Sequence, residues 1–127
     1  MTENDKTALI IEDDDCMARS LSRALRRKKF EVDIAADIAS ARALLATEKI
    51  FDVILADGDV PREASGAIFG VAPIDLLEEF TAASKNGTRI VLISGGSMEP
   101  TVNALKNQGL AYDLAPKPET NEYIKKL

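Results

Sequence analysis

The sequence of 127 residues predicts one doubly wound α/β domain over residues 1–127, in which helices cover both faces of a five-stranded parallel sheet. Short apolar runs alternate with amphipathic helical patterns from one end of the chain to the other. Acidic residues stand directly after the first and the third run. Because helix patterns follow the strand patterns, we expect parallel strands joined by right-handed crossovers.

Five segments have strand patterns, and the second differs from the others. Residues 7–11, 52–56 and 88–94 are largely apolar runs, which are typical of strands buried on both faces of a sheet. Residues 30–34 alternate apolar and charged side chains, which indicates a half-exposed strand at the sheet edge. With residues 110–115 as the fifth strand, the predicted order is 2-1-3-4-5. In this order ligands bind beyond the carboxyl ends of strands one and three.

Most of the predicted helices begin at residues that favour helix starts. Asp14 or Asp15 is a candidate N-cap for the first helix, and Asp37 is the candidate for the second. Residues 57–72 have no regular pattern and are expected to form a long loop, after which Pro73 occupies the first turn of the third helix. The last two helices are expected over residues 97–109 and 118–127.

Composition excludes several classes of function. Twenty-one acidic against sixteen basic residues give a net charge of −5, which disfavours direct nucleic-acid binding. The one basic cluster, residues 26–29, is interpreted as the solvated end of the first helix. No apolar run approaches the ~20 residues that span a membrane, and no signal peptide precedes residue 7, so a cytoplasmic protein is expected. Without histidine and with Cys16 alone, a zinc site is not expected.

Carboxylates follow two strands that are neighbours in the predicted sheet. Glu12 and Asp13 come directly after the first strand, and Asp57 and Asp59 come after the third. Several carboxylates in one crevice repel one another unless some are protonated or a cation neutralises them. Mg²⁺ prefers oxygen ligands and commonly accompanies phosphoryl groups. The sequence therefore predicts a magnesium site at this edge of the sheet.

Two further residues arrive at the same edge from the remaining strands. Ser94 ends the fourth strand and Lys117 follows the fifth. Each alone is more often a strand-end hydroxyl or a solvated side chain. Together with a metal, however, they would surround one carboxylate with the charges that stabilise phosphoryl transfer. Asp57, the first acid after the third strand, is the candidate nucleophile.

These motifs resemble those of the response-regulator receiver family of two-component signalling. They are IIEDD at 10–14, DVILADGDVP at 52–61, VLIS at 91–94 and KP at 117–118. The resemblance implies a flavodoxin-like domain that takes a phosphoryl group from a histidine kinase or a histidine phosphotransfer protein. It also implies that the chain is not an enzyme in the ordinary sense. The implied site is Asp57 as phosphoacceptor, Ser94 and Lys117 on the phosphoryl oxygens, and Mg²⁺ on Glu12, Asp13, Asp57 and the backbone carbonyl of Asp59.

The chain departs from the family pattern in its switch residue and its output. The family usually has an aromatic residue three positions before the lysine, where this chain has Leu114. Tyr112, two residues earlier, is at best an imperfect substitute. No output domain is expected after Leu127, so output would pass through a downstream protein, a homodimer or a phosphate relay.

The stretch from 61 to 73 is the third departure, because it is longer than the loop that the family usually has there. Exposure of Ile68 and Phe69 would mark this stretch as a recognition site. The alternative is that both side chains fold back over the edge of the core.

Two other functions remain as alternatives. A receiver-like scaffold could bind partners without being phosphorylated, as the missing aromatic and the long loop suggest. LADGDV at 55–60 also resembles the D-x-D-x-V motif of haloacid-dehalogenase-type phosphatases. Those enzymes carry their last acid pair after the lysine, whereas only ETNEYIKKL follows the Lys117–Pro118 pair here.

Overall fold

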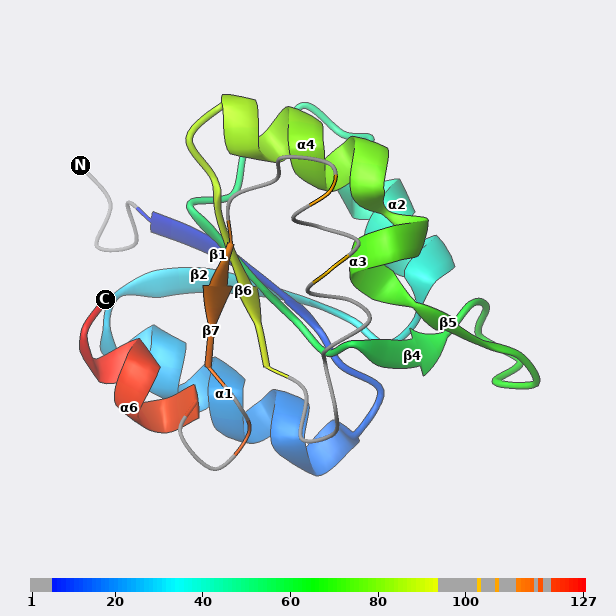
Figure 1. The fold of residues 1–127 in the computed structure, drawn as a ribbon. Coiled ribbons are helices and arrows are strands. Elements are labelled where there is room, and N and C mark those ends of the chain that lie inside the picture. Colours follow the sequence, from blue (N-terminus) through cyan, green and yellow to red (C-terminus); the bar gives the residue numbers. More distant parts are fainter. Residues whose placement is uncertain (1–5, 94–102, 104–106, 108–111, 116, 118–119) are drawn as a thin grey trace.

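The fold is a parallel β-sheet between two layers of helices, seen in a computed structural model (Figure 1). The structure describes residues 6–93, 103, 107, 112–115, 117 and 120–127. None of the helices in this described part is long and apolar enough to cross a membrane.

The main sheet has five strands in the order β2-β1-β3-β6-β7, and all of its neighbouring pairs are parallel. Numbered within this sheet alone, that is the predicted order 2-1-3-4-5, and the predicted fold class is confirmed. The second strand lies at an edge, as its alternating pattern predicted. The strands are β1 Lys6–Ile11, β2 Phe30–Ala35, β3 Val53–Ala56, β6 Arg89–Leu92 and β7 Asp113–Leu114.

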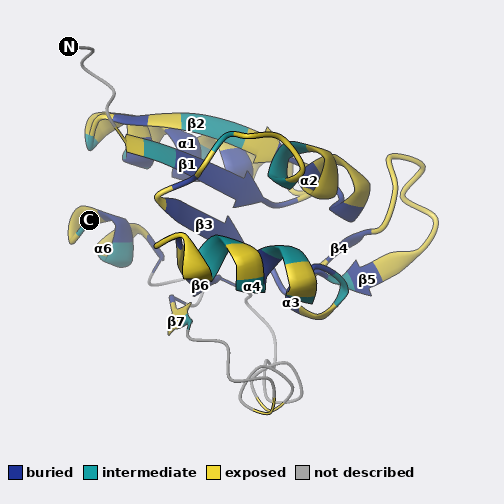
Figure 2. Ribbon diagram, turned by 90° about the horizontal axis from the view of Figure 1, so that it is seen from above, coloured by how far each residue is buried: buried dark blue, intermediate teal, exposed yellow. Residues whose placement is uncertain are grey.

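Helices of the described residues cover both faces of this sheet (Figures 1 and 2). On one face lie α1 (Asp15–Arg27) and α6 (Thr120–Lys125). On the other lie α2 (Ile38–Leu45), α3 (Ala72–Asp75) and α4 (Leu77–Lys85).

The core lies on both sides of the central strands. Successive side chains of a strand point to opposite faces. Ala8 and Ile10 of β1 therefore join the cluster under α1 and α6, while Leu9 and Ile11 join the cluster under α2 and α4. All four are fully buried, which accounts for the continuous apolar pattern of this strand.

The predicted helix caps are present. Asp14 is the N-cap of α1, and its side chain accepts a hydrogen bond of 3.1 Å from the backbone N–H of Met17. Asp37 caps α2 by accepting from the N–H of Ser40 at 2.7 Å. Each cap satisfies one backbone donor at a helix start that would otherwise lack a partner.

The stretch 57–72 is not an irregular loop, and this expectation was wrong. Strands β4 (Asp59–Pro61) and β5 (Phe69–Val71) pair antiparallel as a hairpin, and α3 follows at once. The hairpin rests on α2 through a hydrogen bond of 3.0 Å from the Ala39 N–H to the Arg62 carbonyl. Strands of three residues are too short to leave a readable period-two pattern.

Two large apolar side chains of this hairpin are exposed. Ile68 is 64% and Phe69 is 54% accessible. The alternative that both fold back over the core edge is therefore wrong. Val60 and Gly70, in contrast, are buried where the hairpin meets the body of the domain.

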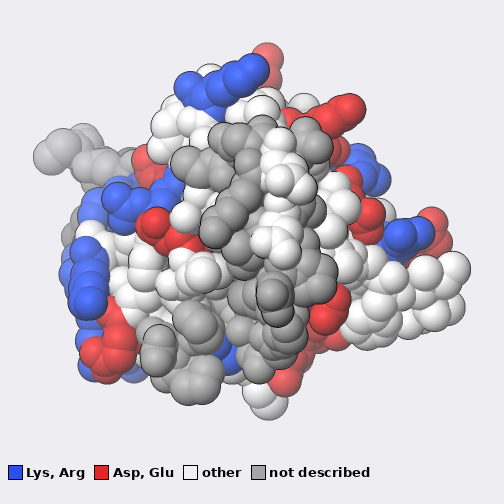
Figure 3. Space-filling view, viewed as in Figure 1, with Lys and Arg blue, Asp and Glu red and all other residues white. Residues whose placement is uncertain are grey.

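Charged side chains are distributed unevenly over the surface. In the view of Figure 3, Lys and Arg side chains gather along the left edge, around the C-terminal end of α6. Of the helix expected over residues 97–109, only Asn103 and Asn107 fall within the described residues.

Candidate metal centre

The register of the sheet brings the first acidic residues together. Strands β1 and β3 are parallel neighbours, and Ile11 pairs with Ala56 at their carboxyl ends. The next residue of each strand is an acid, Glu12 and Asp57. The backbone N–H of Asp57 still donates to the carbonyl of Ile11, at 2.9 Å. The two carboxylates therefore leave the sheet side by side.

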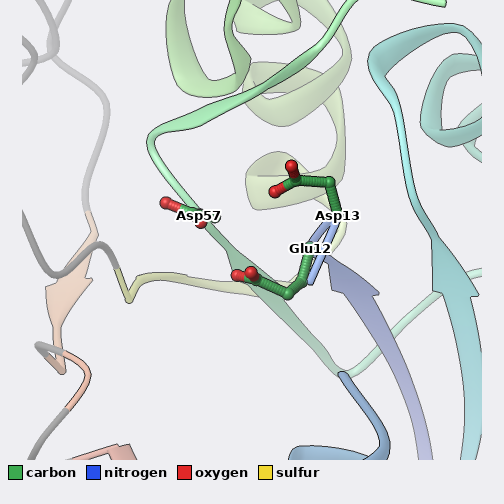
Figure 4. A group of neighbouring side chains, drawn as sticks. All are labelled: Glu12, Asp13 and Asp57. Atoms are coloured by element: carbon green, nitrogen blue, oxygen red, sulfur yellow. The ribbon is translucent and has the colours of Figure 1, made fainter. Parts of the chain in front are cut away.

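Three carboxylates surround one space beyond these strand ends (Figure 4). Glu12, Asp13 and Asp57 each offer an oxygen, and these oxygens lie within 4.8 Å of one another. Glu12 and Asp57 are only 1% and 6% exposed, whereas Asp13 is exposed. The group is thus open to solvent on the Asp13 side and enclosed on the side of the sheet.

Lys117 lies against the two buried carboxylates. Its Nζ donates to Asp57 Oδ2 at 2.9 Å and to Glu12 Oε1 at 3.1 Å, and it is also 3.1 Å from Glu12 Oε2. The side chain is 24% exposed. This geometry places an ammonium group beside an acidic cluster that would otherwise carry only negative charge.

Burial and neighbouring charges shift the pKa values of Glu12 and Lys117. Burial raises the pKa of Glu12 to about 7, with hydrogen bonding and repulsion from Asp57 acting in the same direction and Lys117 opposing them. Burial lowers the pKa of Lys117, but its hydrogen bonds to Asp57 and Glu12 outweigh this and raise the pKa overall. At Glu12, the single ammonium therefore does not offset the combined effect of burial and Asp57.

The donor set fits a hard divalent cation. Oε2 of Glu12 is buried and accepts no hydrogen bond within the described residues, although the charged Lys117 Nζ lies 3.1 Å from it. All three acids offer oxygen ligands, which Mg²⁺ and Ca²⁺ prefer. The arrangement can therefore hold such an ion against Asp57.

For two of the predicted site residues, Asp59 and Ser94, the structure shows less of the predicted role. The N–H of Asp59, the first residue of β4, donates to Asp57 Oδ1 at 3.4 Å, and the Asp59 side chain is exposed. Ser94 lies outside the described residues. Ile93, directly before it, is buried and donates its N–H to the Ala56 carbonyl at 3.0 Å, at the end of β3.

One contact of the site was not predicted. The backbone N–H of Asp14 donates to Glu12 Oε1 at 3.2 Å. Every residue but proline carries such a donor, so sequence patterns do not reveal it. Leu114, at the position of the switch aromatic, is 50% exposed, and Tyr112 is partly buried against the core beneath α2 and α4.

A comparison with known families finds one that matches nearly the whole chain. The model described as "Response regulator receiver domain" matches residues 8–127.

Curated relatives agree with this match. The chain is 31% identical over 116 residues to the acid tolerance regulatory protein ActR of Rhizobium meliloti, covering 88% of this chain and 53% of that protein. The ActR protein of Sinorhizobium medicae matches with the same values. The chain therefore spans about half the length of the curated relatives it matches.

Solved structures share the fold at lower identity. A response regulator of Burkholderia pseudomallei, described with a phosphorylated aspartic acid, a calcium ion and citrate, has a TM-score of 0.75 at 22% identity. It is covered over 65% of its length, against 95% of this chain. The chemotaxis response regulator CheY4 of Vibrio cholerae has a TM-score of 0.71 at 22% identity, with 95% of this chain and 93% of that chain covered.

Proposed function

The chain belongs to the family of response-regulator receiver domains, and on that premise we propose that it accepts a phosphoryl group on Asp57. Such domains are regulatory rather than classical enzymes. The donor in this proposal is a histidine kinase or a histidine phosphotransfer protein. The observation that carries the proposal is the convergence of Lys117 and two further carboxylates on buried Asp57.

In the transfer, an Asp57 carboxylate oxygen attacks the phosphorus of a phosphohistidine. The new O–P bond forms as the N–P bond breaks, and the donor imidazole leaves with the electron pair and takes up a proton. Lys117, 2.9 Å from Asp57 Oδ2, can hold an oxygen of the incoming group by its charge. Glu12 and Asp13, the other two members of the cluster, are acids, so this ammonium stabilises the negative charge that the transfer brings in.

Mg²⁺ is the cofactor of this proposal, held by Glu12, Asp13 and Asp57. When bound, it neutralises charge on the carboxylates and the phosphoryl oxygens. The clustering of one oxygen from each of these three acids within 4.8 Å supports the assignment. The backbone carbonyl of Asp59 as a further ligand, and Ser94 as a hydroxyl contact to the phosphoryl group, follow from the resemblance of the motifs.

The same proposal covers the domain organisation, the location and the partners of the chain. Residues 1–127 would act as one receiver domain in the cytoplasm, in keeping with a single cysteine and a kinase partner. The further partner in this proposal is a downstream protein or a second copy of the chain, and the net charge of −5 disfavours direct contact between these residues and nucleic acid.

The test is labelling with acetyl phosphate and Mg²⁺, followed by intact-mass and peptide mass spectrometry. One phosphoryl group is expected, on Asp57, and Asp57→Asn should abolish the label. Asp59→Asn is the matched control, because it makes the same chemical change two residues away on an exposed side chain. A label on Asp59, or an unchanged label in Asp57→Asn, would contradict the assignment.

Beryllofluoride with Mg²⁺ separates this function from an unphosphorylated scaffold. It mimics the phosphoryl group on a carboxylate, so it should protect the protein from heat and lose that effect in Asp57→Asn. A scaffold that cannot be phosphorylated would show no protection.

A further inference from the structure

A groove of about 630 Å³ lies between helix α4 and the segment that joins α2 to β3. Helices α2 and α4 cover the same face of the sheet (Figure 1), and an ion pair of 2.8 Å between Arg42 Nε and Glu79 Oε2 joins them. The groove lies at the amino ends of the strands, because Phe51 comes shortly before β3 and Thr88 directly before β6. The candidate metal centre lies beyond the carboxyl ends, so the two sites are at opposite edges of the sheet.

Two apolar side chains of this groove are open to a ligand. Ile50 is 60% exposed, and Ala82 of α4 is exposed as well. Neither belongs to either core cluster of the described residues, whereas Leu45 and Ala83, which also line the groove, are half-buried against the cluster under α2 and α4. Ile50 and Ala82 therefore form an apolar floor that a second molecule can cover.

Contacts to two strands hold Ile50 in this exposed position. The Ile50 carbonyl accepts a hydrogen bond of 2.8 Å from Thr7 Oγ1 of β1. On the preceding residue, Lys49 Nζ pairs with Asp33 at 2.8 Å and with Glu31 at 3.3 Å, both on β2. Because the segment is anchored in this way, a partner that covers Ile50 would not have to order it first.

The charge of the groove is negative. Glu48, Glu78 and Glu79 line it, and Lys49 is the one cation among the described residues that do so. The Lys49 ammonium is already paired with the two acids of β2, and Glu79 is paired with Arg42. Glu48 and Glu78 are exposed and form no ion pair with another described residue. Both carboxylates are therefore available to positive charge on a partner.

We propose that this groove binds a basic amphipathic helix of a partner protein. Apolar side chains of that helix would cover Ile50 and Ala82, and lysine or arginine side chains beside them would meet Glu48 and Glu78. Ala82 and Ala83 are small, so a second helix can approach α4 closely. The carboxylates would repel nucleic acid and anionic lipid, and a free metal cation would leave the apolar floor uncovered. Because the groove lies at the other edge of the sheet from the candidate metal centre, the proposal does not depend on phosphorylation.

The probe is a synthetic 18-residue helical peptide with a Leu and Ala stripe flanked by Lys, titrated into the whole chain at low salt and followed by fluorescence anisotropy. Ile50→Ser should weaken binding roughly fivefold or more, because the apolar contact is lost. Ile68→Ser is the matched control, since Ile68 is 64% exposed against 60% for Ile50 and lies on the hairpin, outside the groove. The control should leave the affinity unchanged.

A second pair of variants tests the charge of the groove. Glu48→Gln with Glu78→Gln should weaken binding roughly tenfold or more, as expected for two lost charge contacts. The control, Glu63→Gln with Glu122→Gln, removes the same charge from exposed residues that do not line the groove, and should change the affinity roughly twofold at most. All of the altered side chains are exposed, so every variant should melt with the unaltered chain. Should one groove variant melt early, the other decides alone.

Three outcomes would overturn the proposal. The first is no saturable binding of the peptide up to roughly 1 mM. The second is an equal loss of affinity in a groove variant and its control, which would mean diffuse attraction rather than a groove. The third is equal binding of a peptide in which every Lys is replaced by Gln, or every Leu by Ser, because the groove would then not select a basic amphipathic helix.

Discussion

The two ends of helix α1 lie beside charged regions of opposite sign. Among the described residues, the charged side chains are buried and paired in one region, and exposed and unpaired in the other. Near the N-terminal end, Glu12 and Asp57 are buried and meet Lys117 within 3.1 Å. Near the C-terminal end, Arg23 and Arg27 are exposed and form no ion pair among the described residues. A buried charge must be compensated inside the molecule, because an unpaired ion there is costly. An exposed charge carries no such requirement, so it can serve a partner.

Removing Lys117 is the most severe test of this contrast. In Mg²⁺-free buffer at neutral pH, Lys117→Met should lower the free energy of unfolding by roughly 3 kcal/mol, since it leaves buried carboxylates without a cation. Urea denaturation measures the loss. The control is Lys49→Met, which breaks pairs with Asp33 and Glu31 at the partly exposed edge strand and should cost under about 1 kcal/mol. Equal losses in the free energy of unfolding would mean that the acidic cluster does not depend on its cation more than the surface ion pairs do.

Mg²⁺ should stabilise the acidic region and leave the basic one unaffected. At a concentration of about 100 times its dissociation constant, the ion should add about 2.7 kcal/mol to the free energy of unfolding. Asp13→Asn should reduce this gain, because Asp13 supplies one of the three clustered oxygens. Arg23→Glu should leave it unchanged. Thermal shift assays over a Mg²⁺ titration give the comparison, and an undiminished gain in both Asp13→Asn and Asp57→Asn would refute the metal assignment.

The pH dependence of stability should distinguish the two regions as well. The pKa of Glu12 is about 7, above its ordinary value of 4.5, so the folded state binds this proton more tightly than the unfolded state does. Its contribution is fully present below about pH 4.5 and is lost as the pH rises through about 7. In metal-free buffer, Glu12→Gln should remove this loss of stability with rising pH. Glu122→Gln, on an exposed side chain of α6, should not remove it. Parallel slopes for Glu12→Gln and the unaltered chain would contradict the burial of Glu12 as the cause.

The sequence predicts features that nearby residues determine better than features that depend on contacts between distant segments. The meeting of Glu12 and Asp57 could be predicted because each follows a clear apolar strand, and neighbouring parallel strands end at one edge. The approach of α6 to the basic end of α1 could not, because no pattern in residues 120–127 specifies where the helix packs. The hairpin could not be predicted for another reason: Gly70 is buried close to Ile38, so part of its packing comes from a helix more than 30 residues earlier in the chain.

The hairpin offers the smallest expected effect, and with it a third kind of surface that is neither acidic nor basic. Ile68 and Phe69 are 64% and 54% exposed, so replacing both with Ser should change the free energy of unfolding by less than about 0.5 kcal/mol. Val60→Ala in the same hairpin should cost about 2 kcal/mol, because that side chain is fully buried. Differential scanning calorimetry of the two variants separates them.

If the tip serves recognition, the Ser variant should keep its melting temperature and lose self-association or partner binding, measured by sedimentation velocity. A large fall in melting temperature would instead mean that the tip is part of the core. Only Gly58 stands between Asp57 and β4, so we expect phosphorylation of Asp57 to alter this hairpin without the switch aromatic that Leu114 replaces.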